Sequence, residues 1–282
     1  MKEYYLEFAG LRILLQTPYE ITISESLRPF LSRGNDTVDC TIALRSCDRL
    51  PGFAEGGIWR GPEYYDSIDG VSRVFFCATA QMTPIGVTQF FENGNISISV
   101  LHQHLSGFTG SAGILNHIGF ENLLLQRCGL LLHASLIKYA GKAIAFAGPS
   151  GVGKSTHADI WKTCLQADIL NGDRAALKKE DSGWIAYGAP YAGTSGIYIN
   201  DSAPLAAIVL LSQAEENRFY RVDATQAFRQ LYPELAIHHW DKTFAVKAVD
   251  LCLQLMEDVP VYRLECRPEE DSARLVMKGL GL

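Results

Sequence analysis

The sequence predicts an α/β protein whose first part is rich in β-strands. Residues 1–108 contain short β-branched and aromatic runs between clusters of Gly, Pro, Asn and Asp, a pattern typical of strands joined by turns. Residues 109–282 alternate such runs with apolar segments of helical period, which favours strands that alternate with helices. A glycine-rich loop joins one of these runs to a helical segment. We therefore expect two domains, 1–108 and 109–282, with the functional site in the second.

The strands of the first domain are predicted by four runs: YYLEFAGLRILLQT, DCTIALRSC, SRVFFCATAQ and NISISVLHQHL. No residues with catalytic spacing stand out among them. The second domain begins with TGSAGILNHIGFENLLLQRCG, whose apolar residues recur at helical spacing. This pattern predicts one helix, with Ser111 as its cap and Gly129 at its end.

The rest of the second domain has a clear order of elements. LLLHASLI and KAIAFAG predict a hairpin that turns at KYAG, and KSTHADIWKTCL predicts a helix. The short strand ADIL ends at NGDR. Later elements are the strands GWIAYGAP, LAAIVLLS and VPVYRLEC and the helices DKTFAVKAVDLCLQLME and PEEDSARLVMKGL, with Asp241 as a helix cap.

Residues 148–156, GPSGVGKST, match the phosphate-binding pattern G-x-x-x-x-G-K-[ST]. Gly148, Gly151 and Gly153 allow successive backbone N–H groups to turn inward around an anion, which side chains would obstruct. The following helix directs its positive N-terminus at the same anion. The sequence therefore predicts nucleotide binding at this loop.

Each part of the loop has an expected role in holding ATP and Mg²⁺. Lys154 is expected to reach the β- and γ-phosphates, and the Ser155 hydroxyl is expected to bind Mg²⁺. The predicted nucleotide-binding residues are Gly148, Pro149, Ser150, Gly151, Val152, Gly153, Lys154, Ser155 and Thr156.

A carboxylate must complete such a site, on the metal or on the nucleophile. LAAIVLLSQ ends in Ser212 and Gln213, so that strand supplies no acid. Asp173 in ADILNGDRAAL follows a predicted strand, at the edge where ligand sites of α/β sheets form. Asp173 is therefore the expected catalytic carboxylate and metal ligand, and the alternative is a turn residue or helix cap.

The segment HASLIKYAGKAIAFAGPSGVGKST…ADILNGDR resembles the catalytic domain of HPr kinase/phosphorylase, over residues 129–180. The resemblance implies an α/β P-loop kinase domain of the type shared with ATP-dependent phosphoenolpyruvate carboxykinase. It implies that His133, 15 residues before Gly148, belongs to the catalytic site, where otherwise it would be a core histidine. It also implies that Asp173 is the general base toward the acceptor hydroxyl.

The sequence departs from that family at two places. Gly172 stands where the family has the first of two aspartates, and YGAPYAGTSG (187–196) stands where it has a Glu-containing signature. In this last segment Thr194 and Ser195 either face the acceptor or form a hairpin turn. Divergent members of the family resemble the chain more closely, with HAS…GPSG.GKST…NGD and a late PVYRLEC; some of these modify ribosomal peptides and others phosphorylate small hydroxyl compounds.

The expected function is an ATP-dependent kinase that transfers the γ-phosphoryl group to a hydroxyl of a peptide, protein or small molecule. A regulatory nucleotide-binding module is the alternative, in which ATP occupancy sets a conformation and no acceptor exists. A carboxykinase-like enzyme is a third, but the metal-binding His and Lys expected of it are not evident.

Composition restricts the partners and the compartment. The net charge is −6 and no basic block occurs, which argues against nucleic acid or an anionic membrane as partner. The N-terminal segment has the acids Glu3 and Glu7 and does not resemble a signal peptide. Seven cysteines without C-x-x-C spacing fit reduced thiols, so we expect a cytoplasmic protein. The sequence leaves a homo-oligomer open.

Overall fold

The computed structural model describes residues 1–34, 37–78, 82–191, 193 and 195–282. Contacts divide the chain into two compact units, Met1–Phe120 and Glu121–Leu282, whereas the sequence suggested a division at 108/109. Residues up to 120 lie with the first unit because Gly110 pairs with Thr22 and the Thr88 hydroxyl donates to the His117 carbonyl. None of the helices among the described residues is long and apolar enough to cross a membrane.

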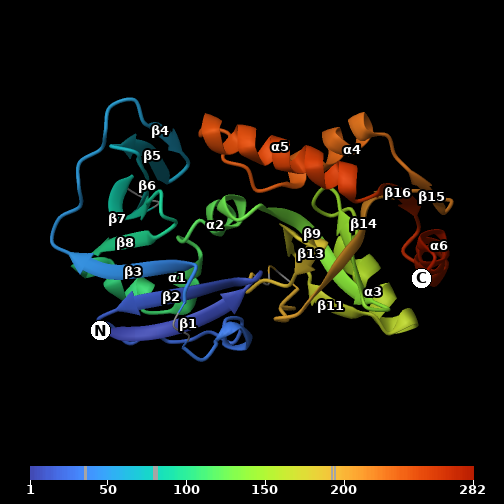
Figure 1. Ribbon diagram of the computed structural model, residues 1–282, viewed down its shortest axis with the longest axis horizontal. Coiled ribbons are helices and arrows are strands. Elements are labelled where there is room, and N and C mark those ends of the chain that lie inside the picture. The colour runs from blue at the N-terminus through green and yellow to red at the C-terminus, as the bar shows by residue number, and fades with distance from the viewer. Residues whose placement is uncertain (35–36, 79–81, 192, 194) are drawn as a thin grey trace. The chain divides into compact units, whose positions relative to one another are not determined.

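The first unit is built on an eight-stranded sheet with the order β1-β2-β3-β8-β7-β6-β5-β4 (Figure 1). The side chains of β2 alternate strictly between buried and half-buried, as the period of a strand requires. The elements are β1 (Lys2–Phe8), β2 (Leu11–Thr17), η1 (Arg28–Phe30), β3 (Cys40–Cys47), β4 (Ile58–Arg60), β5 (Glu63–Ile68), β6 (Val71–Ala78), β7 (Thr83–Phe90), β8 (Ile96–Leu101) and η2 (His102–Phe108).

The single helix predicted for residues 111–128 is wrong. Two short helices form instead, α1 (Ser111–Leu115) and α2 (Phe120–Gln126). Gly119 lies between them with φ +55°, a conformation that interrupts a right-handed helix. Ser111 is the first helical residue of α1 and not its cap, and its hydroxyl donates to Ser24 Oγ. The helical spacing of apolar residues can therefore continue in the sequence even where a glycine with positive φ interrupts the helix.

The second unit contains another eight-stranded sheet in which five strands close on themselves. β10 pairs with β9 and also, in parallel, with β14, so β9, β12, β13, β14 and β10 form a closed ring of pairings. The elements are β9 (Gly129–Tyr139), β10 (Lys142–Ala147), α3 (Lys154–Leu165), β11 (Asp168–Asn171), β12 (Arg174–Glu180), β13 (Gly183–Tyr187), β14 (Ser202–Gln213), β15 (Arg218–Arg221), α4 (Ala224–Leu231), η3 (Tyr232–Glu234), α5 (Lys242–Asp258), β16 (Val261–Cys266) and α6 (Glu270–Leu280).

Most predicted elements of this unit are present. β9 and β10 form the expected hairpin, with Tyr139 opposite Lys142 at its turn. Asp241 caps α5, since its carboxylate accepts the Phe244 N–H at 3.0 Å. The chain is thus a mixed α/β protein with two sheets.

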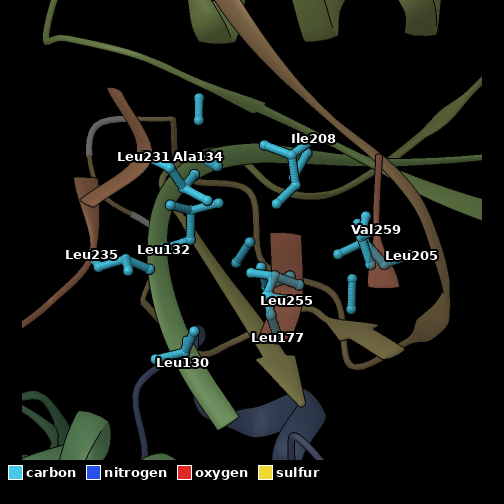
Figure 2. Close-up of a cluster of buried hydrophobic side chains, with 14 of the residues drawn as sticks. Leu130, Leu132, Ala134, Leu177, Leu205, Ile208, Leu231, Leu235, Leu255 and Val259 are labelled. Atoms are coloured by element: carbon cyan, nitrogen blue, oxygen red, sulfur yellow. The ribbon is translucent and has the colours of Figure 1, made fainter. Parts of the chain in front are cut away.

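The strand β10 is buried on both faces and separates two hydrophobic cores. Its alanines (143, 145 and 147) join the core of α4 and α5, while Ile144 and Phe146 join the core of α3 and α6. Figure 2 shows the first core, where Leu130 and Leu132 of β9 lie among side chains that include Leu231 and Leu255. The loop that follows β10 is therefore held by a strand that packing fixes from both sides.

His157 on α3 is a buried histidine, and its burial is expected to make the folded protein less stable in acid. Trp161 Nε1 donates to its Nε2 at 3.2 Å, and burial lowers its pKa from the ordinary 6.5 to about 4. In the unfolded chain His157 takes up a proton near pH 6.5, whereas in the folded protein it does so only near pH 4. The folded state is therefore most stable relative to the unfolded state above pH 6.5, and it loses stability as the pH falls from 6.5 toward 4. The shift corresponds to about 3 kcal/mol.

We expect His157→Gln, which keeps an acceptor for Trp161, to remove most of this pH dependence. The measurement is the free energy of urea unfolding between pH 7 and pH 4. His104→Gln, at a histidine that is only partly buried, is the control. Equal slopes in the wild type and the His157 variant would refute the assignment.

Candidate functional site

The glycine-rich loop has the backbone that the sequence pattern requires. Gly148, Gly151 and Gly153 have φ values of +144°, +80° and +110°, which residues with side chains rarely adopt. A Cβ added at Gly148 would lie 3.2 Å from Val152 Cγ1 and 3.3 Å from the Leu211 carbonyl oxygen. Glycine is therefore required here by conformation and also, at Gly148, by close packing.

Lys154 is the first residue of α3 and folds back over this loop. Its Nζ donates to the Gly148 carbonyl at 2.7 Å and to the Pro149 carbonyl at 3.3 Å, and the residue is 7% exposed. Ser155 and Thr156, in the same turn, are exposed. The loop thus leads into a helix N-terminus whose first turn has one buried ammonium and two exposed hydroxyls.

Asp173 lies in the turn between β11 and β12, and Asn171 organises this turn. Asn171 Oδ1 accepts the N–H groups of Asp173 and Arg174, both at 2.8 Å. Its Nδ2 donates to the carbonyls of Ala189 at 2.8 Å and Tyr191 at 2.9 Å, and the residue is fully buried. The sequence indicated no role for Asn171, although Asn side chains commonly accept the backbone N–H two residues on, as in an Asx-turn.

Asn171→Ala is expected to destabilise the protein by about 3 kcal/mol or more. It removes one acceptor and one donor group that serve four buried backbone partners, and each group left unpaired costs about 1–3 kcal/mol. Chemical unfolding measures the loss, with the exposed Asn200→Ala as the control. A change below about 1 kcal/mol would mean that water or a rearranged turn replaces these bonds.

His133 brings two carboxylates together. Its Nε2 lies 3.5 Å from Asp173 Oδ1, and its Nδ1 lies 3.1 Å from Glu234 Oε2. Arg174, which pairs with His133 across the sheet, places its Nε 3.3 Å from Asp173 Oδ2. The Asp173 side chain is 31% exposed, so a ligand can reach it. The predicted residues His133 and Asp173 therefore lie side by side.

Glu234 is a residue of this cluster that the sequence did not indicate. It belongs to η3, about 100 positions after His133, in a segment without a recognisable motif. The signal is visible only in the structure, where η3 lies beside β9.

The electrostatics of Lys154 connect the loop with these acids. The pKa of the Lys154 ammonium is lowered from its ordinary value, because burial outweighs the opposing effect of the Glu234 carboxylate and the smaller one of Asp173. The two carboxylates and the lysine thus belong to one electrostatic unit.

The segment after β13 lies against the acidic turn. A Cβ added at Gly172 would lie 2.2 Å from Ser195 Oγ, and one at Gly193 would lie 2.6 Å from Asp173 Cγ. An aspartate at position 172 would therefore collide with this segment, which is a physical reason for the glycine there. Thr194, an expected acceptor contact, lies outside the described residues.

Among the described residues, no group of three or more His, Cys, Asp and Glu side chains could hold a metal ion. Mg²⁺ commonly uses one or two protein ligands together with phosphate oxygens and water. The Ser155 hydroxyl and the Asp173 carboxylate are chemically suited to that limited role.

No family model and no curated protein matches the chain. Among solved structures, the Hpr(Ser) kinase/phosphatase from Coxiella burnetii is similar with a TM-score of 0.31 and 11% sequence identity. The similar region covers 54% of this chain and 93% of that chain. The function proposed below therefore rests on the residues of this chain.

Proposed function

We propose that this protein is an ATP-dependent kinase that transfers the γ-phosphoryl group of ATP to a hydroxyl acceptor. The observation that carries the proposal is the position of Asp173, an accessible carboxylate beside His133 of β9, the strand that pairs with β10 before the glycine-rich loop. A phosphate site and a proton acceptor in one rigid sheet are the minimum that phosphoryl transfer needs.

The loop suits a triphosphate. Cβ atoms added at Gly151 and Gly153 would meet nothing within 4 Å, so the space beside these backbone groups is open. The Lys154 ammonium, which now donates to loop carbonyls, has the charge and length to turn to phosphate oxygens. Ser155 and Asp173 would hold Mg²⁺, which when bound neutralises charge on the phosphates.

Asp173 has the position of a general base. Its exposed carboxylate takes the proton of the acceptor hydroxyl while that oxygen bonds to the γ-phosphorus and the bond to ADP breaks. Arg174 and His133 hold the carboxylate from two sides. Lys154 balances the charge of the phosphates.

We propose a hydroxyl-bearing peptide, protein or small molecule as the acceptor. Nucleic acid and membrane surfaces are poor candidates for a chain with a net charge of −6. The segment 188–201, which reaches Asp173 at Gly193, is the part of this unit best placed to recognise the acceptor.

The test is incubation with Mg²⁺, γ-labelled ATP and sets of hydroxyl-bearing peptides and small molecules. We expect ADP and a phosphorylated hydroxyl in equal amounts. Binding of Mg-ATP without transfer to any acceptor or to water would support the regulatory nucleotide-binding module instead.

A further inference from the structure

Glu234 is held rigidly against the strand that carries His133. Its neighbour Leu235 pairs with Leu132 of β9, and the Ala236 N–H donates to the Leu131 carbonyl at 2.9 Å. Pro233 lies in the first turn of η3, where its fixed φ suits the helix. The Glu234 side chain is only 11% exposed. Its carboxylate is therefore placed by backbone contacts and by burial, unlike a mobile surface acid.

We propose that Glu234 is a positioning residue for the phosphoryl transfer proposed above, because its carboxylate accepts the Nδ1–H of His133 and turns Nε2 of that ring toward Asp173. This inference rests on the proposed kinase function.

The chemistry of the two groups fixes the direction of the hydrogen bond. An ionised carboxylate only accepts, so the 3.1 Å contact requires the proton on His133 Nδ1. In the neutral form of the ring this is its one N–H, so Nε2 is an acceptor 3.5 Å from Asp173 Oδ1, whereas a charged ring would donate from Nε2 to that carboxylate. When Asp173 takes the proton of the acceptor hydroxyl, the new carboxyl O–H has an acceptor beside it. This partner exists only after proton transfer begins, which is the kind of interaction that speeds a reaction.

The Glu234 carboxylate also favours the charged form of the Lys154 ammonium beside the loop. Of the two carboxylates that raise the pKa of Lys154, Glu234 has the larger effect. The charged and titratable groups around this site include His133, Asp173, Arg174, Glu234 and Lys154, and Arg174 also interacts with Glu121 and Tyr191. Glu234 therefore supplies a second carboxylate near Asp173, which the glycine at position 172 cannot.

The first experiment measures the tautomer of His133 by ¹⁵N NMR of the nucleotide-free protein. We expect the Nδ1–H tautomer in the wild type and in Glu234→Gln, whose amide oxygen still accepts. Glu234→Ala should lose this tautomer in favour of Nε2–H, and the exposed Glu216→Gln should match the wild type. A doubly protonated ring in the wild type at neutral pH, or retention of Nδ1–H in Glu234→Ala, would overturn the proposal. If Glu234→Ala fails to fold, a wild-type ring with Nε2–H overturns it instead.

The second experiment measures kcat and KM for ATP with water as the acceptor, so that no other acceptor is needed. We expect Glu234→Ala to lower kcat by about 10- to 100-fold, as is typical for partners that orient a functional histidine, with KM within a few-fold. Glu234→Gln should retain more activity. An unchanged kcat, or a Mg²⁺ requirement that rises in Glu234→Gln, would overturn the positioning role, the latter in favour of metal binding.

The two proposals fail in different ways. A wild-type protein that transfers no phosphoryl group to any acceptor or to water refutes the kinase function, while the NMR result for the nucleotide-free protein still stands. A wild-type kinase whose Glu234→Ala variant is fully active refutes the role of Glu234 alone.

Discussion

Lys154→Ala is expected to weaken Mg-ATP binding by about 10- to 100-fold, because each hydrogen bond from a charged donor contributes about 1.5–3 kcal/mol. The ammonium is buried beside the loop, and two carboxylates help to keep it charged. The lost affinity should come from contacts to the phosphates and not from contacts to the nucleoside. In calorimetric titrations the affinity for adenosine should change little, so the ratio of ATP to adenosine affinity should fall.

Two controls separate lost charge from a damaged loop. Lys162→Ala removes an exposed lysine from the same helix and should bind Mg-ATP like the wild type. Because Lys154 also bonds the carbonyls of Gly148 and Pro149, the unfolding free energy of Lys154→Ala must be measured alongside. Equal ATP affinity in the wild type and Lys154→Ala would remove the claim that this loop binds phosphate.

Asp173→Asn is expected to separate binding from transfer. The amide keeps the size of the side chain and an oxygen for Arg174, but it loses the negative charge and the ability to take a proton. A positioned general base contributes about 10²–10⁴-fold to the rate. Transfer should therefore fall about 100-fold or more while ATP affinity stays within a few-fold.

Other roles of Asp173 give different results. A metal ligand would raise the Mg²⁺ concentration needed and weaken nucleotide binding as well. A simple turn residue would change neither quantity beyond the effect of lost stability. Asp168→Asn, at the exposed start of β11, is the matched control. Full transfer activity in Asp173→Asn would defeat the general-base mechanism.

The features that the sequence predicted well are local in the chain. The three positive φ values of the glycine-rich loop follow from contiguous residues, and so does the capping of α5 by Asp241. Asp173 was singled out because it closely follows a strand shortly after the loop, and a strand end is recognisable without any tertiary contact. The predicted roles of these residues in binding and catalysis stay predictions.

The features that the sequence did not predict depend on distant contacts or on single dihedral angles. Glu234 meets His133 only because Leu235, directly after η3, pairs with Leu132 of β9, and no local pattern encodes that pairing. The helix expected over 111–128 is divided at Gly119, where one backbone angle overrides an apolar period that continues past it. Asn171 is intermediate, because its turn is local but its carbonyl partners lie beyond β13.

The closed ring of strands has a consequence for how this protein could diversify. The strand β9 pairs with β12 through its first half and with β10 through its second, so one continuous strand sets the span between the glycine-rich loop and Asp173. Mutations that alter this span would have to distort several paired strands at once. The segment 188–201 connects two ring strands without belonging to either, so side chains of this segment that do not contact the acidic turn can change without altering the ring pairings. In the kinase proposed here, new acceptors would therefore arise through such side-chain changes, while the paired strands keep the spacing between the glycine-rich loop and Asp173.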